Sequence, residues 1–117
     1  MLLVEDDTIT RRTAQKMLAE RFGCRVDTLS TGAGVVEAVR TGTYDLLFLD
    51  CMLPGMSGLK ITHAIRSLEG EAAKTHIIGV TTLEKAECLA AGMSDWIGKP
   101  ATMEAYKAAL IRWINLA

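Results

Sequence analysis

Short apolar runs alternate along this chain with longer stretches in which apolar residues recur every three or four positions. The short runs, bounded by polar residues or glycine, predict five β-strands at residues 2–4, 24–29, 45–49, 76–80 and 95–98. The longer stretches predict five α-helices, whose apolar positions begin at Ile9, Val35, Ile61, Leu83 and Met103. Strands that are apolar on both sides and alternate with helices imply a parallel sheet covered by helices on both faces.

Length and composition fit one globular domain, which we expect to cover residues 1–117. The chain has 117 residues, of which 50% are hydrophobic and 23% are charged, enough for one core but not for two. Its net charge of −1 disfavours a nucleic-acid-binding surface, which would normally show a basic stripe. No segment approaches the ~18 apolar residues of a membrane span, and the chain opens without a secretory signal. We therefore expect a soluble, cytoplasmic location.

The three cysteines give no sign of a disulfide framework or a metal site. Cys24, Cys51 and Cys88 are odd in number, widely spaced and outside any CxxC motif. Reduced thiols in a cytosolic compartment are the simplest interpretation.

Acidic residues end two strands that should be neighbours in such a sheet. Functional groups of open α/β sheets gather at the carboxyl ends of strands, beside the point where strand order reverses. The first strand runs into Glu5, Asp6 and Asp7, and the third ends at Asp50. Two carboxylates ~4 Å apart repel by ~4 kcal/mol at an effective dielectric of ~20, so we expect a positive charge nearby. A hard divalent ion such as Mg²⁺ prefers carboxylate oxygens and bridges readily to a phosphate.

The acids also have a purely structural interpretation. Asp7 stands just before the first predicted helix, where an N-cap is its more natural role. Asp50 is different, because it ends a wholly apolar strand and opens no helix. The chemistry is therefore expected at Asp50.

Four segments together resemble the receiver domain of two-component response regulators. These are "LLVEDD" (2–7), "LLFLDCMLPGMSG" (46–58), "IIGVTT" (77–82) and "WIGKP" (96–100), which stand in the family's order and context. The resemblance covers nearly the whole chain. It implies a flavodoxin-like three-layer α/β/α fold, with five helices and a five-stranded parallel sheet in the order 2-1-3-4-5.

The resemblance assigns an acceptor and a metal site. Asp50 would be the nucleophile that takes a phosphoryl group to form an acyl phosphate. Glu5, Asp6, Asp50 and the backbone carbonyl of Met52 would hold Mg²⁺, which neutralises charge on the transferring phosphoryl oxygens.

Further residues would contact the phosphoryl group or report its presence. The resemblance implies that Lys99 supplies a positive charge, Thr81 a hydroxyl donor and Thr82 a backbone N–H. Trp96 would be the aromatic switch residue. Taken alone, a lysine is ordinarily a surface residue, and the threonine pair could equally cap a helix.

The chain departs from the family pattern in three places. Trp96 stands where tyrosine or phenylalanine is usual, and its bulk predicts muted switching. Ala101 replaces a bulky apolar residue after "KP". The segment 81–92 is about four residues shorter than is usual, roughly one helical turn. That difference indicates either a truncated fourth helix or an absent segment.

Three rival functions can be weighed against named residues. A hydrolase of the haloacid dehalogenase type needs a second carboxylate two positions after its nucleophile, where this chain has Met52. A flavin-phosphate binder would be repelled by Glu5, Asp6 and Asp7. A degenerate receiver that serves only as an interaction module would not need the full set of acid, threonine and lysine.

The expected partners are a histidine kinase, a histidine phosphotransfer domain, or both. The segment "ALIRWI" (109–114) and the acceptor loop resemble receivers attached to hybrid sensor kinases. Such a receiver could belong to the cytoplasmic part of a membrane-bound sensor, while its own domain contacts neither membrane nor nucleic acid. A stand-alone single-domain regulator is the alternative. In either case we expect self-catalysed phosphorylation and slow dephosphorylation, with no separate substrate turnover.

Overall fold

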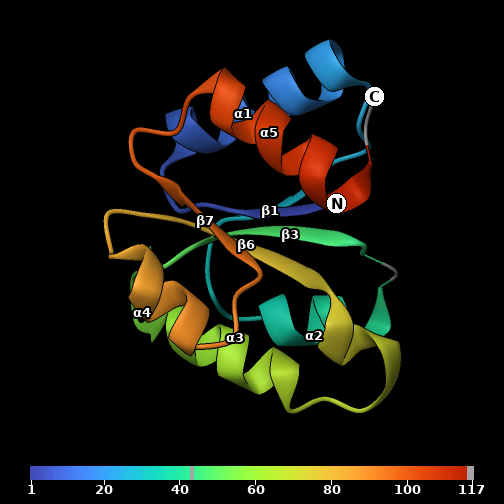
Figure 1. The fold of residues 1–117 in the computed structure, drawn as a ribbon, viewed down its shortest axis with the longest axis vertical. Helices are drawn as coiled ribbons and strands as arrows, with labels where there is room; N and C mark the ends of the chain where they lie inside the picture. Colours follow the sequence, from blue (N-terminus) through green and yellow to red (C-terminus); the bar gives the residue numbers. More distant parts are fainter. Residues whose placement is uncertain (43, 116–117) are drawn as a thin grey trace.

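A central sheet of five parallel strands organises the molecule (Figure 1). The computed structural model describes residues 1–42 and 44–115. The strands are β1 (Leu2–Val4), β2 (Asp27–Leu29), β3 (Leu46–Asp50), β6 (His76–Thr81) and β7 (Asp95–Gly98). Their order is β2-β1-β3-β6-β7, and every neighbouring pair is parallel. Because β6 and β7 are the fourth and fifth strands of this sheet, the predicted order 2-1-3-4-5 is confirmed.

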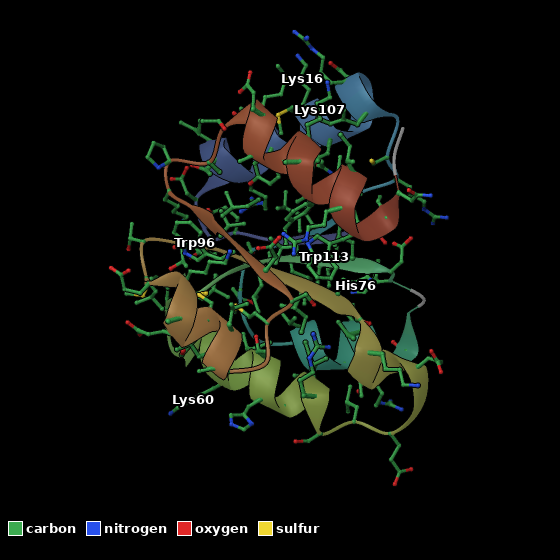
Figure 2. The ribbon with its side chains drawn as sticks, viewed as in Figure 1. Lys16, Lys60, His76, Trp96, Lys107 and Trp113 are labelled. Atoms are coloured by element: carbon green, nitrogen blue, oxygen red, sulfur yellow. The ribbon has the colours of Figure 1, made fainter. Side chains whose placement is uncertain are left out.

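In the described residues, five α-helices cover the sheet in two layers, as predicted. They are α1 (Thr8–Phe22), α2 (Val35–Thr41), α3 (Gly58–Arg66), α4 (Lys85–Ala90) and α5 (Met103–Ile114), with a 3₁₀ turn η1 at Gly70–Lys74. Figure 1 shows α1 and α5 on one face of the sheet and α2, α3 and α4 on the other. In Figure 2, Lys16 and Lys107 mark the first layer and Lys60 the second.

Alternation along the strands supplies both layers of the core. Within β3, Leu46 and Phe48 pack with the α1 and α5 side, whereas Leu47 and Leu49 pack with the α2 and α3 side. All four side chains are fully buried. Since successive strand residues point to opposite faces, an unbroken apolar run is what a sheet covered on both sides requires.

The second strand and the loop after Asp50 differ from the prediction. The second strand was expected at 24–29, but only Asp27–Leu29 forms β2, because β1 offers just three residues for pairing. After Asp50 the chain makes a small unpredicted hairpin from β4 (Met52–Leu53) and β5 (Met56–Ser57). Gly55 lies in its turn with φ of 75°, a conformation that glycine adopts without strain.

The fourth helix is short, in keeping with the shortened segment 81–92. It has six residues, and its N-cap residue, Glu84, makes no side-chain capping bond. A helix of this length is marginal by itself, so it depends on contacts with the rest of the fold.

A partly buried arginine anchors the loop that follows α4. Arg66, in the last turn of α3, donates through Nε to Gly92 O at 2.8 Å. Its Nη1 donates to Ala73 O and Thr75 O, both at 2.7 Å, and its Nη2 donates to Ser94 Oγ at 3.3 Å. Burial lowers the pKa of this guanidinium. The side chain thus joins α3, η1 and the α4–β7 loop.

Two of the three cysteines are buried on the α4 side of the sheet. Cys51 and Cys88 are 2% and 0% exposed, whereas Cys24 is partly exposed. All three thiols are free. Burial raises the pKa of Cys51 to about 12 and also raises the pKa of Cys88. Buried thiols with a raised pKa are poorly reactive.

Asp7 caps the first helix, as its position in the sequence indicated. Its Oδ2 accepts hydrogen bonds from Thr10 N at 2.8 Å and from Thr10 Oγ1 at 2.7 Å. These bonds satisfy a donor of the first turn that has no partner within the helix. Hydrogen bonds from the Thr10 side chain and backbone lower the pKa of Asp7.

Replacing Asp7 with alanine should therefore lower the temperature of thermal unfolding at neutral pH. Asp7→Asn should keep most of the stability, because its amide oxygen can accept the same bonds. A lowered folded-state pKa means that the stabilisation is present above the ordinary value of 3.8 and is lost as the pH falls through the folded value. Circular dichroism melts at a series of pH values would test this. An alanine variant whose deficit persisted unchanged in strong acid would contradict the capping role.

Candidate functional site

Carboxylates from two strands meet at the carboxyl edge of the sheet, as predicted. Val4 of β1 pairs with Leu49 of β3, so the residues that follow them, Glu5 and Asp50, lie side by side. Glu5, Asp6 and Asp50 each place a carboxylate oxygen within 4.8 Å of the other two. Glu5 and Asp50 are buried, whereas Asp6 is exposed.

Lys99 supplies the positive charge that this acidic cluster requires. Its Nζ lies 3.1 Å from Glu5 Oε1 and 3.1 Å from Asp50 Oδ2. The backbone of Lys99 extends the β6–β7 pairing, because its N–H donates to Thr81 O at 3.0 Å. The strand end thus aims the ammonium at both carboxylates.

The local electrostatics shift the pKa values of two of these groups upward. Burial raises the pKa of Glu5, and the hydrogen bonds from the Asp7 backbone and Lys99 only partly oppose it. Burial acts to lower the pKa of Lys99, but the hydrogen bonds to Glu5 and Asp50 outweigh it and the pKa is raised. Three carboxylates and one ammonium leave the cluster with a formal charge of −2. That charge and the all-oxygen donor set fit a bound Mg²⁺.

Asp50 is held in one orientation by two donors. Its Oδ1 accepts from the backbone N–H of Met52 at 2.9 Å, and its Oδ2 accepts from Lys99. Met52 begins the β4–β5 hairpin, and its side chain points out, 61% exposed. The hairpin therefore aligns the carboxylate through the backbone.

Gly58 allows the start of α3 to pack against this strand end. A Cβ at that position would lie 2.6 Å from Cys51 Cα and 2.9 Å from Asp50 O, distances that no side chain tolerates. The Gly58 N–H donates to Cys51 O at 3.0 Å. This glycine is needed for close approach rather than for an unusual backbone angle.

Thr81 ends β6 next to the acceptor strand. The register pairs Asp50 with Val80, which places the fully buried Thr81 one residue beyond. Its Oγ1 accepts from the backbone N–H of Leu83 at 3.1 Å. Thr82, the next residue, is exposed.

Trp96 also holds the loop that follows Thr81. Its indole Nε1 donates to Leu83 O at 2.8 Å, so the Leu83 residue is bonded through both its N–H and its C=O. Gly98 leaves room for the ring, since a Cβ there would lie 2.8 Å from the Trp96 Cη2 atom. Figure 2 shows Trp96 at the end of the sheet beside α4. Indole bulk alone suggested muted switching, whereas the structure adds a hydrogen bond that phenylalanine could not make.

A groove of about 580 Å³ borders the cluster on the α1 side. Its walls include Ile9, Met17, Lys99, Ala101 and Tyr106. Ile9, expected on the apolar stripe of α1, is 77% exposed, while the core contacts of the helix come from Ala14 and Leu18. The small Ala101 leaves the groove open beside Lys99.

Arg11 contacts the end of β1, and the sequence did not predict this contact. Its Nη1 lies 3.1 Å from Glu5 O and 3.4 Å from Asp6 O. Arg11 and Arg12 are adjacent arginines of α1, and nothing in the pattern of the sequence distinguishes them.

Fold and cluster together define a flavodoxin-like α/β domain with a candidate divalent-cation site at the carboxyl edge of its sheet. Residues 1–111 match the family model of the response regulator receiver domain. The chain therefore belongs to the receiver-domain family, as the sequence motifs indicated.

Three comparisons find proteins that are similar to this chain in sequence or in fold. Hybrid signal transduction histidine kinase B of Dictyostelium discoideum is 35% identical over an alignment covering 86% of this chain and 6% of the kinase. The receiver domain of sensor histidine kinase PA1611 from Pseudomonas aeruginosa PAO1, solved with magnesium in its active site cleft, is 33% identical with a TM-score of 0.86. That match covers 97% of this chain and 95% of the other.

The third comparison is a co-crystal structure of two Saccharomyces cerevisiae proteins, the histidine phosphotransfer protein Ypd1 and the receiver domain of Ssk1. It contains a chain with the same fold, at a TM-score of 0.85 and 23% identity, covering 99% of this chain and 90% of that one. This chain spans only a small part of the length of hybrid signal transduction histidine kinase B. Within residues 1–42 and 44–115, no helix is long and apolar enough to cross a membrane.

The Trp96 hydrogen bond yields a direct test. Trp96→Phe keeps an aromatic ring but removes the donor, so the Leu83 N–H should exchange with solvent about fivefold faster, the loss expected for a net ~1 kcal/mol hydrogen bond. Amide hydrogen exchange followed by NMR measures this rate. Trp113→Phe is the matched control, because Trp113 donates to Asp95 Oδ2 at 2.9 Å and packs on the other face of the sheet. Equal exchange at Leu83 in the two variants would show that Trp96 does not anchor the loop.

Proposed function

We propose that this receiver accepts a phosphoryl group from a phosphohistidine onto Asp50. The observation that carries the proposal is the Asp50 carboxylate itself. It is 2% exposed, aligned by Met52 N–H and Lys99, and adjacent to two further acids. A buried carboxylate held this way is a positioned nucleophile rather than a solvated surface charge.

In the proposed transfer, an Asp50 oxygen attacks phosphorus, the new P–O bond forms and the P–N bond to the donor imidazole breaks. Lys99 lies 3.1 Å from Asp50 Oδ2 and would stabilise negative charge on the phosphoryl oxygens. The Thr81 hydroxyl and the Thr82 backbone N–H are proposed as further donors to those oxygens. Glu5, Asp6, Asp50 and the backbone carbonyl of Met52 would hold Mg²⁺, whose charge neutralises the transferring group.

Trp96 is proposed as the residue that reports phosphorylation to the surface. It contacts the loop after Thr81 through Leu83 O, so a shift of Thr81 toward the phosphoryl group would strain this bond. The α4–β7 surface would then respond to chemistry at Asp50.

The proposed partners are a histidine kinase and a histidine phosphotransfer domain. A donor histidine must approach Asp50 from the carboxyl edge of the sheet, where the groove beside Lys99 opens. Exposed Ile9 on the rim of that groove would be covered by such a partner. The likeness to a hybrid kinase and to a receiver solved with a phosphotransfer protein supports this assignment.

We further propose that residues 1–117 act as one receiver unit on the cytoplasmic side of the cell. The net charge of −1 gives no reason for contact with nucleic acid or membrane. A stand-alone regulator that acts by binding other proteins would use the same acceptor chemistry.

The acceptor can be tested with a small phosphodonor. Incubation with Mg²⁺ and acetyl phosphate should add one acid-labile phosphoryl group, and Asp50→Asn should abolish the labelling because the amide is not a nucleophile. Intact-protein mass spectrometry measures the added mass. Asp45→Asn, a carboxylate at the opposite end of β3, should label normally. Full labelling of the Asp50 variant would place the acceptor elsewhere.

The metal site predicts opposite effects on binding and on stability. Asp6→Asn should remove most Mg²⁺ affinity and yet leave the metal-free protein at least as stable, because it relieves repulsion from Glu5 and Asp50. Thermal melts with and without MgCl₂ separate the two effects. Wild-type protein should gain stability from the ion and the variant should not. A marked loss of metal-free stability would instead assign Asp6 a structural role.

A further inference from the structure

Arg11 reaches back from the first helix to the strand end that carries the metal-site acids. It lies in the first turns of α1, and its guanidinium Nη1 donates to Glu5 O at 3.1 Å, with Asp6 O at a longer 3.4 Å. The two carbonyls belong to the residues whose side chains join the acidic cluster. Arg11 is partly buried, which agrees with a side chain folded onto the loop.

The contact is not an ion pair, although acids surround it. Within residues 1–42 and 44–115, Arg11 makes no salt bridge within 4.0 Å, and both of its hydrogen bonds go to backbone oxygens. Glu5 and Asp7 are also fixed within this loop. The Glu5 N–H donates to Leu29 O at 3.1 Å, and the Asp7 N–H donates to Glu5 Oε2 at 3.1 Å. Arg11 adds charge-assisted donors to the carbonyl side of the same turn.

We infer that Arg11 is a positioning residue for the divalent cation, an inference that rests on the proposed function. By fixing the Glu5 and Asp6 carbonyls it holds the β1–α1 turn, from which the two carboxylates would bind Mg²⁺. Outer-shell hydrogen bonds of this kind orient metal ligands without touching the ion. Without them, the turn must be ordered when the cation binds, at a cost in affinity.

When Arg11 is replaced, the loss of its positioning role and the loss of its charge should change the Mg²⁺ affinity in opposite directions. A guanidinium beside the site repels a second cation, so the simple loss of its charge should tighten Mg²⁺ binding. Loss of positioning should weaken it. Arg12 provides the matched control, because it is the next residue of the same helix, carries the same charge and is exposed.

The experiment titrates MgCl₂ into wild type, Arg11→Met, Arg11→Lys and Arg12→Met without any phosphodonor, following backbone amide shifts by NMR. Arg11→Met should raise the Mg²⁺ dissociation constant about 10-fold, the lower end of the loss typical for outer-shell partners of metal ligands. Arg12→Met should stay within about twofold of wild type, on the tighter side. Arg11→Lys keeps the charge, but its shorter side chain places its nitrogen less far from the helix than Arg11 Nη1, so its Mg²⁺ affinity should fall between those of wild type and Arg11→Met.

The inference would be overturned if Arg11→Met bound Mg²⁺ as tightly as Arg12→Met does. It would also be overturned if Arg11→Lys bound Mg²⁺ with wild-type affinity. Should Arg11→Met fail to fold, as judged by circular dichroism, Arg11→Lys alone decides between the outcomes. If the wild-type protein itself shows no Mg²⁺-dependent shifts at Glu5, Asp6 and Asp50, the proposed metal site fails and not only the role of Arg11.

Discussion

The ammonium of Lys99 is the interaction on which the site depends. It joins the carboxyl ends of β1, β3 and β7 by lying 3.1 Å from both Glu5 and Asp50. Each contact supplies a gross attraction of about 5 kcal/mol at an effective dielectric of ~20, similar to the repulsion between two carboxylates at this spacing. One lysine can therefore offset the Glu5–Asp50 repulsion, but it leaves Asp6 uncompensated. Lys99 therefore offsets only part of the negative charge of the cluster, and a divalent cation could neutralise the remainder.

Much of this arrangement could be predicted because it follows from the ends of strands. The apolar runs predict β1 and β3, and a parallel arrangement places the carboxyl ends of both strands at one edge of the sheet. Glu5 and Asp50, which stand at those ends, must therefore lie close together. Asp7 was assigned correctly as an N-cap by its position before a helix. Long-range side-chain contacts could not be predicted in this way. Arg11 and Arg12 are equivalent in the sequence, and only the turn of the helix decides which one faces the strand end.

The hairpin after Asp50 was not predicted, because it too leaves no distinguishing pattern in the sequence. β4 and β5 have two residues each, which is too short for any periodic signal. The hydrogen bond from Trp96 to Leu83 O was equally invisible, because its acceptor is a backbone carbonyl and carries no sequence signature. It changes the interpretation of Trp96 from a bulky residue that resists movement to a donor that fixes a loop. Together with Arg66 at Gly92, it secures both flanks of the short α4.

The burial of Cys88 has a consequence for how α4 can be studied. This thiol is fully covered while α4 is docked, whereas Cys24 remains partly exposed in the same molecule. A thiol-specific reagent reaches Cys88 only during excursions in which the helix detaches, so its labelling rate under native conditions reports the free energy of that local opening. Cys24 serves as the internal reference for reagent activity. The chain thus carries its own native-state probe of α4, readable by mass spectrometry without an introduced label.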